Sequence, residues 1–441
     1  MQNPFAIQIL AAGDLHLGKA SSGLPGHPPQ ASTKHTCELL VELAIGHDID
    51  ALLLLGDIVD QDNRYFEAVG PLLTGFKKLR QNGIQVFMVS GNHDHEVLSQ
   101  VSTSQARVPQ GQAPDNVHLL GSNGQWEMKS FSKGALTVQF AGWSFPGQWV
   151  SDSPLLKFDQ LALDPALPVV GMLHCDVDAR ESNYAPVSLD ELIHTGADAW
   201  LLGHIHKPQS LRGQNPAIWY TGSPHAMSAR EPGIHGPLLL TIEGKNELYA
   251  RTIPLSPIRY ETIRLDVSAA GNEGELRDLI TTSLHHDAET RQGELEQVSF
   301  LVYDMELEGE HRRARDMDLW TARVNDDFDL PTPSGTRISV RKTINMVQPQ
   351  IEDLEKLAAE PSPAGVLADT ILAYRKGRTN GFLDELLIQW NLKFEGIRGS
   401  GTYFPLRSEG RMPEMAGEEA RTCILRECNR LLNELLAQRE Q

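Results

Sequence analysis

The first half of the chain alternates short apolar runs with polar clusters, and this alternation constrains the fold more than any other feature. Helical periodicity occupies residues 37–45 and 68–81 between the runs. Six runs have the length and composition of buried strands: 7–12, 51–55, 85–89, 138–142, 169–173 and 199–202. Strands that alternate with helices in this way predict an α/β sandwich.

Most of these runs end in a polar cluster that offers oxygen or imidazole nitrogen. In chain order the clusters are Asp14-Leu15-His16, Gly56 to Asp60, Gly91 to Asp94, His174, and Gly203 to His206. A pair of divalent cations about 3.5 to 4 Å apart needs such a mixture of carboxylate, amide and imidazole. A single cluster would prove little, but the ordered set predicts a two-metal hydrolase site.

The first two clusters supply carboxylates. Asp14 and His16 alternate at a strand end, so both side chains can chelate one ion. Asp57 follows four leucines and a glycine, where an unpaired carboxylate would be costly. Bridging two cations would compensate that charge, and the alternative is that Asp57 caps a helix.

The third cluster combines an amide with a histidine. Asn92 can offer its amide oxygen to a metal, and His93 beside it is the natural acid or transition-state stabiliser. Asp60 could accept a hydrogen bond from His93 and orient that ring.

The remaining histidines complete the candidate site. His174 closes an apolar run and is predicted to be a ligand, although an isolated histidine is more often structural. His204 and His206 stand on either side of Ile205, so each can face a different cation.

These motifs resemble those of the calcineurin-like metallophosphoesterase superfamily, with all five present in order. The resemblance implies a four-layer α/β/β/α sandwich and makes His93 the catalytic histidine. It also implies two ligand sets, one of Asp14, His16, Asp57 and His206 and the other of Asp57, Asn92, His174 and His204.

A narrower likeness begins after the last cluster. The segment His204 to Pro208, then Tyr220 to Pro224, and then Glu231 resemble the SbcD-type DNA repair exonucleases. Residues 254–267 are similar to the start of the capping domain of that family, particularly its YhaO-like branch, and in many members a histidine stands at the position of Asp60. The resemblance implies a manganese-dependent 3'-to-5' exonuclease, with possible endonuclease activity, that works with an SbcC-like SMC-type ATPase docked through C-terminal helices. Oxygen and nitrogen ligands also admit Mg²⁺, Fe²⁺ or Zn²⁺.

The sequence pattern changes after residue 254, and we expect the chain to consist of three regions. A metallophosphoesterase domain of residues 1–255 precedes a small α+β capping domain of residues 256–346 and a mainly helical region of residues 347–441. In residues 418–438 an apolar stripe at helical spacing either packs on the chain itself or docks a partner.

Composition limits the partners. The formal net charge is -19, which argues against a protein that binds the phosphates of nucleic acid without a partner. Bound cations would offset several acids, and a partner could supply affinity for a polyanion. No run approaches the roughly 18 to 20 apolar residues of a membrane span, and the N-terminus lacks signal-peptide features. We therefore expect a cytoplasmic protein without membrane contact.

The leading hypothesis is thus a two-metal phosphodiesterase that acts on DNA in DNA repair. DNA, an SMC-like ATPase and a second copy of the chain are the candidate partners. One alternative is a metallophosphoesterase that cleaves a cyclic nucleotide, a nucleotide anhydride or another small phosphoester. A scaffold protein that keeps a metal site is a third hypothesis, and the intact ligand positions favour an enzyme.

Overall fold

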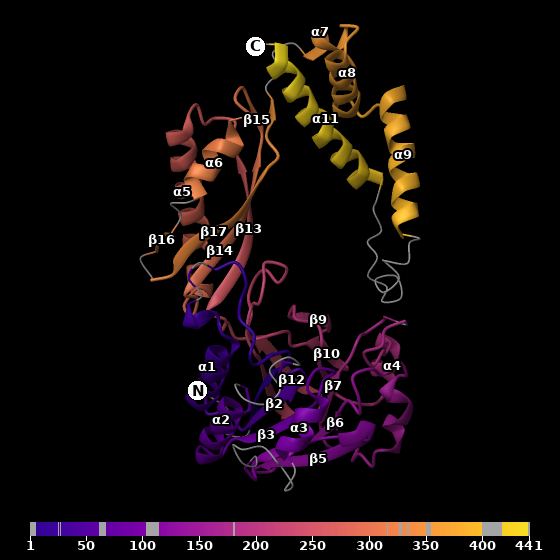
Figure 1. Cartoon of the computed structure of the whole chain (residues 1–441). Helices are drawn as coiled ribbons and strands as arrows, with labels where there is room; N and C mark the ends of the chain where they lie inside the picture. The colour runs from indigo at the N-terminus through magenta and orange to yellow at the C-terminus, as the bar shows by residue number, and fades with distance from the viewer. Residues whose placement is uncertain are drawn as a thin grey trace. The chain divides into compact units, whose positions relative to one another are not determined.

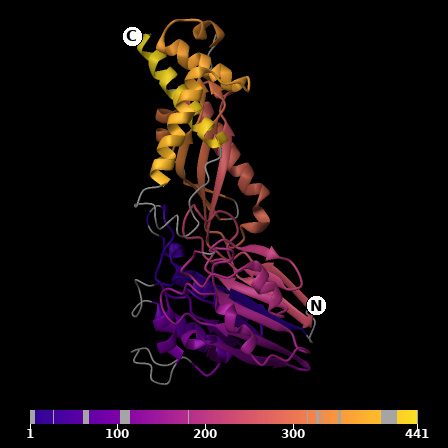
Figure 2. The same ribbon diagram turned by 90° about the vertical axis from the view of Figure 1, so that its right-hand side faces the viewer.

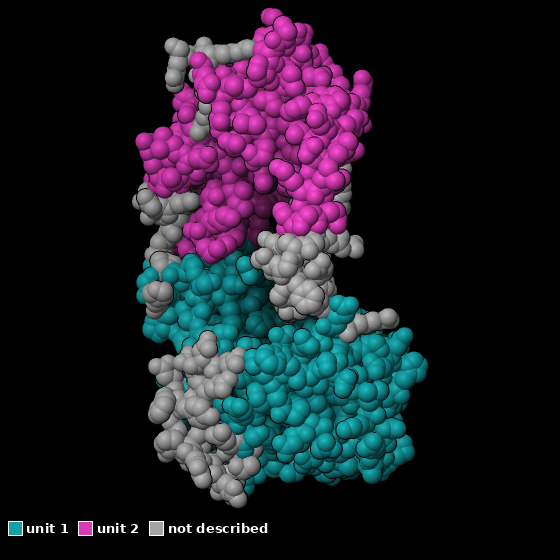
Figure 3. Space-filling view, turned by 45° about the vertical axis from the view of Figure 1, so that its right-hand side comes forward, with its two compact units in different colours: residues 1–261, 291–302, 333–337 teal, residues 262–290, 303–332, 338–441 magenta. Residues whose placement is uncertain are grey.

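The computed structural model describes residues 6–24, 26, 28–60, 68–102, 114–179, 181–314, 316–325, 329–332, 335–349, 354–398 and 417–439. The chain divides into two compact units (Figure 3). Unit 1 comprises residues 1–261, 291–302 and 333–337. Unit 2 comprises residues 262–290, 303–332 and 338–441.

Unit 1 is built on two six-stranded sheets (Figure 1). The first has the order β12-β11-β1-β2-β3-β4, from Glu247–Thr252, Leu238–Gly244, Ile7–Ala12, Ala51–Leu55, Gln85–Val89 and Val117–Leu119. The second has the order β5-β6-β7-β8-β10-β9, from Trp126–Lys133, Leu136–Trp143, Val169–His174, Ala199–Gly203, Ala217–Tyr220 and Gln209–Arg212. Strands β1 to β4 pair in parallel, as do β6, β7, β8 and β10, so their carboxyl ends meet at one edge of each sheet.

Side-chain alternation along the strands builds four layers. On β1, Ile7 and Ile9 pack into the core between the sheets, whereas Leu10 packs toward α1 (Thr33–Gly46) and α2 (Val69–Gln81). The second sheet packs its outer face on α4 (Leu189–His194) and the 3-10 helix Pro154–Gln160. The predicted α/β/β/α sandwich is therefore confirmed.

All six predicted strands are present, and three of them extend further than the apolar runs. Residues 138–142 lie within β6, which spans Leu136–Trp143, while β7 and β8 continue to His174 and Gly203. His174 pairs with Gly203 across these two strands. Because the ladder continues into the polar clusters, the strands themselves set the positions of these candidate ligands.

The later part of the chain combines a sheet with helices. Its sheet has the order β13-β14-β17-β16, from Ile258–Asp266, Phe300–Glu308, Arg337–Asn345 and Asp329–Pro331. Helices α5 (Glu273–Thr290) and α6 (Met317–Asn325) follow β13 and the two-residue strand β15 (Glu310–His311), which pairs with β18 (Gln348–Pro349). The predicted boundaries at residues 255 and 346 stay a prediction.

The C-terminal region is helical, as predicted. It contains α7 (Leu354–Ala358), α8 (Pro363–Arg375), α9 (Gly381–Arg398) and α11 (Gly417–Arg439) (Figure 2). The apolar stripe of α11 packs on this bundle through Ile424, Cys428 and Leu432. Of the two alternatives for the stripe, the structure thus has packing on the chain itself. No helix among the described residues is long and apolar enough to span a membrane.

Candidate metal centre

Two glycines let the strand ends of unit 1 approach closely enough to form a site. A β-carbon on Gly91 would lie 2.2 Å from Oδ1 of Asp57, and one on Gly203 would lie 2.1 Å from the carbonyl oxygen of Leu55. Real side chains do not tolerate such distances, so the loops after β2, β3 and β8 can meet only because these positions lack a side chain.

Four of the seven predicted ligands have a left-handed backbone. The φ angles are 52° at Asp14, 42° at His16, 50° at Asp57 and 96° at His204. This conformation is unfavourable for residues other than glycine and persists where the surrounding structure enforces it. Such strain clusters at functional sites, and here it occurs at four candidate ligands.

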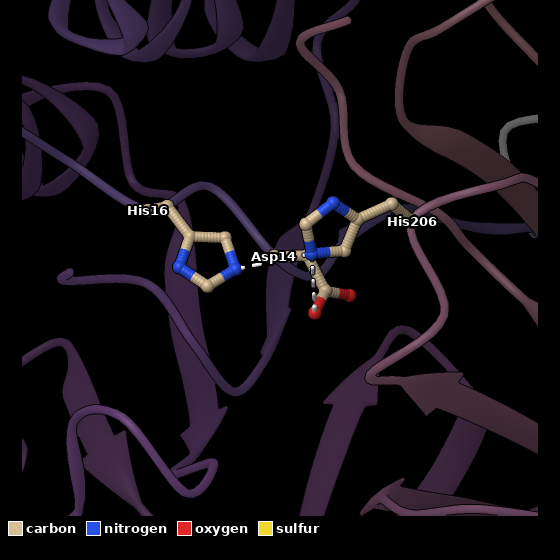
Figure 4. A group of neighbouring side chains, drawn as sticks. All are labelled: Asp14, His16 and His206. Carbon is tan, nitrogen blue, oxygen red and sulfur yellow. Dashed lines mark hydrogen bonds and ion pairs between the residues drawn. The ribbon is translucent and has the colours of Figure 1, made fainter. Parts of the chain in front are cut away.

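Asp14, His16 and His206 form the first group of candidate ligands (Figure 4). Nε2 of His16 lies 3.2 Å from Nε2 of His206, which lies 3.9 Å from Oδ1 of Asp14. When two nitrogens bind the same metal ion at about 2.1 Å and the two bonds are near a right angle, the nitrogens lie about 3 Å apart. The three residues present therefore fit a metal ion.

Asp57 connects this group with a second one. Its Oδ2 lies 3.8 Å from Nε2 of His16 and 3.4 Å from Nε2 of His174. Nε2 of His174 is also 3.2 Å from Oδ1 of Asn92. The carboxylate thus lies between the two predicted metal positions, and Asp14, His16, Asp57 and His174 make a candidate dual-metal site.

His204 faces outward from this group through one ring nitrogen. Its Nε2 lies 3.2 Å from Oδ1 of Asp176, and its ring centroid lies 5.1 Å from that of Tyr184. Its backbone N–H donates to both carboxylate oxygens of Asp14, at 3.1 and 3.0 Å. The predicted ligand role of His204, which stays a prediction, therefore requires Nδ1.

The two predicted catalytic residues contact different members of the centre. Nε2 of His93 is 3.9 Å from Oδ2 of Asp57, and the His93 side chain is 30% exposed. Asp60 places Oδ1 2.8 Å from Nζ of Lys19 and 3.5 Å from Nδ1 of His16. The role of Asp60 in orienting His93 stays a prediction, because these two contacts of its carboxylate are with other residues.

Residues 7–208 match the family model of the calcineurin-like phosphoesterases. The chain is similar to this family over these residues, which make up less than half of its length. This match indicates a metal-dependent hydrolase, which agrees with the candidate dual-metal site at the strand ends of unit 1.

Curated relatives of the chain are distant. It is 28% identical over 283 residues to the uncharacterized metallophosphoesterase YhaO of Bacillus subtilis, covering 62% of this chain and 66% of that protein. It is 22% identical to the DNA double-strand break repair protein Mre11 of Methanosarcina mazei, covering 64% of this chain and 43% of Mre11. It is 25% identical to a component of the nuclease SbcCD of Rhodobacter capsulatus, covering 54% of this chain and 67% of that component. The chain thus spans about two thirds or less of the length of these relatives.

In unit 1, hydrogen bonds also fix the ring nitrogens of two candidate ligands that do not face the proposed metal. Nδ1 of His174 donates to the carbonyl oxygen of Leu55 at 3.0 Å, and Nδ1 of His206 donates to Oε1 of Glu231 at 2.8 Å. Metal-binding histidines usually make such a bond with the ring nitrogen that does not bind the metal. The sequence singled out Glu231 only through the family resemblance and Asp176 not at all, because no spacing rule links either residue to its histidine.

Charge within the centre is strongly coupled. Burial raises the pKa of Asp57, but the imidazoles of His174, His16 and His93 outweigh burial and lower it. Burial lowers the pKa of His174, but the Asp57 carboxylate outweighs burial and raises it to about 10. Without a cation the centre therefore favours a carboxylate beside a protonated imidazole, and a bound metal would replace that proton.

Asp94 supports the centre through the backbone of two loops. Its carboxylate accepts from the backbone N–H of Ile58 at 2.6 Å and of Gly91 at 2.8 Å, which ties the loops after β2 and β3 together. Burial, together with the nearby Asp57 charge, raises the pKa of Asp94 to about 7.

Proposed function

We propose that the chain is a two-metal phosphodiesterase that acts on DNA, as a 3'-to-5' exonuclease with additional endonuclease activity, and that Mn²⁺ is the preferred metal. The observation that carries phosphoester hydrolysis is the position of the Asp57 carboxylate between two groups of candidate ligands. Two divalent cations bound there would act as Lewis acids that activate water and offset charge on phosphoryl oxygens.

The side chains have separate parts in the proposed reaction. Asp14, His16, Asp57 and His206 hold one cation, and Asp57, Asn92, His174 and His204 hold the other. His93 donates a proton, or a hydrogen bond, to the leaving oxygen of the phosphoester. Its partial exposure supports this role, because substrate can reach a ring that is 30% exposed.

The assignment to DNA rests on the sequence after His206 and on the relatives named for nuclease activity and DNA repair. The formal net charge of -19 favours the second candidate, a small phosphoester such as a cyclic nucleotide or nucleotide anhydride. The net charge of the chain favours a small phosphoester and the named relatives favour DNA, so an assay with both kinds of substrate decides between them.

The test is to incubate the purified chain and Mn²⁺ with end-labelled duplex DNA and, separately, with small phosphodiesters. We expect stepwise shortening of the DNA from its 3' ends. Hydrolysis of the small substrates alone would contradict the assignment to DNA and leave phosphoester hydrolysis standing. No hydrolysis of either substrate by the metal-loaded chain would contradict the proposed function as a whole.

We further propose an SMC-like ATPase as partner, docked on the helical C-terminal region. Helix α9 exposes large apolar side chains, with Ile388 at 59%, Leu392 at 65% and Ile397 at 51% exposure. Replacing Ile388 and Leu392 with Glu should abolish co-purification with the ATPase and leave hydrolysis of short substrates unchanged. Co-purification that survives the double substitution would contradict this docking site.

A further inference from the structure

We propose that Glu231 and His235 are positioning residues that hold His206 in the tautomer and orientation a metal ligand needs. The proposal rests on the metal-binding part of the proposed function and is independent of the phosphoester that is cleaved. It adds two residues outside the predicted ligand sets to the machinery of the centre.

Glu231 connects the His206 ring to the backbone of Met227 through its two carboxylate oxygens. Oε1 accepts from Nδ1 of His206 at 2.8 Å, and Oε2 accepts from the backbone N–H of Met227 at 2.9 Å. An ionised carboxylate only accepts hydrogen bonds, so Nδ1 must carry the proton. Nε2 of His206 then keeps its lone pair, on the side of the ring that faces His16 and Asp14.

His235 holds the backbone around these contacts. The ring is buried, with Nδ1 2.8 Å from the carbonyl oxygen of Ser223 and Nε2 3.0 Å from that of Glu231. Ser223 in turn donates its backbone N–H to the carbonyl oxygen of His206 at 2.8 Å. His235 thus lies between Ser223, which bonds the His206 backbone, and Glu231, which bonds the His206 ring. A neutral ring donates to one of these two carbonyl oxygens at a time.

The frame is anchored beyond His235 as well. The carbonyl oxygen of His235 accepts from the backbone N–H groups of Leu255 and Ser256, at 2.9 and 3.0 Å. Contacts of the His235 ring thus hold the segment from Ser223 to His235 together, and the His235 carbonyl oxygen ties it to the residues that follow β12. A carboxylate partner raises the basicity of the imidazole it orients, so Glu231 should strengthen metal binding at His206.

The first test measures Mn²⁺ binding to the full chain by titration calorimetry. Glu231→Gln removes the charge, and we expect affinity at one of two sites to fall about 10- to 100-fold while the other site is unchanged. Glu191→Gln is the matched control, because Glu191 also accepts from a backbone N–H, that of Ser188 at 2.7 Å, but has no contact with a candidate ligand. We expect this control to bind Mn²⁺ like the wild type.

The second test separates positioning from general stability. His235→Ala should weaken Mn²⁺ binding at the same site, and His311→Ala should not, although His311 is also buried and bonded to a carbonyl oxygen, that of Ala270 at 2.6 Å. Thermal unfolding of both variants records the shared loss of a buried hydrogen bond. In a His206→Ala background, Glu231→Gln should cause no further loss of affinity, because both changes act on one ligand.

The outcomes distinguish this inference from the proposed function. Equal Mn²⁺ affinities for Glu231→Gln and Glu191→Gln, or a further loss in the His206→Ala background, would overturn the positioning role alone. Failure of the wild-type chain to bind Mn²⁺ would overturn the proposed function, and this inference with it.

Discussion

At the residue scale, exposure separates His93 from His16 and His174, two of the histidines predicted to bind metal. The His93 side chain is 30% exposed, whereas those of His16 and His174 are 3% and 0% exposed. Burial lowers the pKa of His93, and the Asp57 carboxylate opposes this effect. An imidazole at the surface of a buried centre can meet a substrate oxygen that the enclosed rings cannot reach.

This difference predicts distinct phenotypes for two substitutions. His93→Ala should still bind two Mn²⁺ ions but lose turnover by about 10²- to 10⁴-fold, the usual contribution of an acid–base group. Asp57→Ala should lose metal binding as well as turnover, because its carboxylate lies between both ligand groups. Calorimetric Mn²⁺ titration and steady-state rates on one phosphodiester measure the two effects. Unchanged hydrolysis in both variants would contradict the mechanism.

At the element scale, the site depends on how closely the loops after neighbouring strands approach. Gly91→Ala should displace Asp57, because the new β-carbon would lie 2.2 Å from Oδ1 and 2.8 Å from the backbone nitrogen of that residue. We expect a loss of about 1 to 3 kcal/mol in the free energy of unfolding, together with weaker Mn²⁺ binding. Gly213→Ala is the control, since no atom beyond the adjacent residues lies within 4 Å of its new β-carbon. Denaturant unfolding and Mn²⁺ titration measure the two effects. Equal free energies of unfolding and equal Mn²⁺ affinities for Gly91→Ala and Gly213→Ala would contradict this prediction.

A second element-scale feature ties the loop after the first cluster to the segment before Glu231. Buried His225 places Nδ1 2.7 Å from Oγ1 of Thr36, and Nε2 lies 2.8 Å from Oγ of Ser21 and 3.1 Å from the carbonyl oxygen of Ala31. Burial lowers the pKa of His225 from 6.5 to about 4. The folded state therefore favours the neutral ring.

This lowered pKa predicts a loss of stability in acid. The contribution is fully present above pH 6.5 and is lost as the pH falls toward 4, because the unfolded chain binds the proton more readily. The shift corresponds to about 3 kcal/mol in the free energy of unfolding. His225→Gln keeps polar groups but does not titrate, so the wild type should lose about that much more stability than the variant between about pH 7 and pH 4. Denaturant unfolding at the two pH values measures this difference. An equal loss in the free energy of unfolding for the wild type and the variant would contradict the prediction.

At the scale of the whole molecule, all candidate ligands belong to unit 1 and none to unit 2. Metal binding should therefore stabilise the two units unequally. At 100 times the dissociation constant, bound Mn²⁺ adds about 2.7 kcal/mol to the free energy of unfolding of the part that holds it. Hydrogen exchange with and without a chelator should show added protection in β1, β2 and β7 but not in α8 or α11. Equal protection in both sets of elements, or protection that persists in Asp57→Ala, would contradict this expectation.

The sequence by itself determined six strands in the two sheets of unit 1 and the order in which candidate ligands follow them. Apolar runs such as residues 51–55 and 85–89 are local signals, and a carboxylate or histidine at the end of a buried strand needs compensation wherever that strand lies. The match of the family model to residues 7–208 agrees with the resemblance drawn from those motifs. The lengths of β6, β7 and β8 were underestimated, because a ladder partner extends a strand past its apolar run.

Only the tertiary structure decided which atoms face one another. The contact of Glu231 with His206 spans 25 residues and that of Asp176 with His204 spans 28, and neither follows a helical or strand period. The structure likewise places Asp60 beside Lys19 and His16, and its role in orienting His93 stays a prediction. A side-chain hydrogen bond depends on the crossing of distant loops, so its partner is set when the sheets pack and leaves no local pattern in the chain.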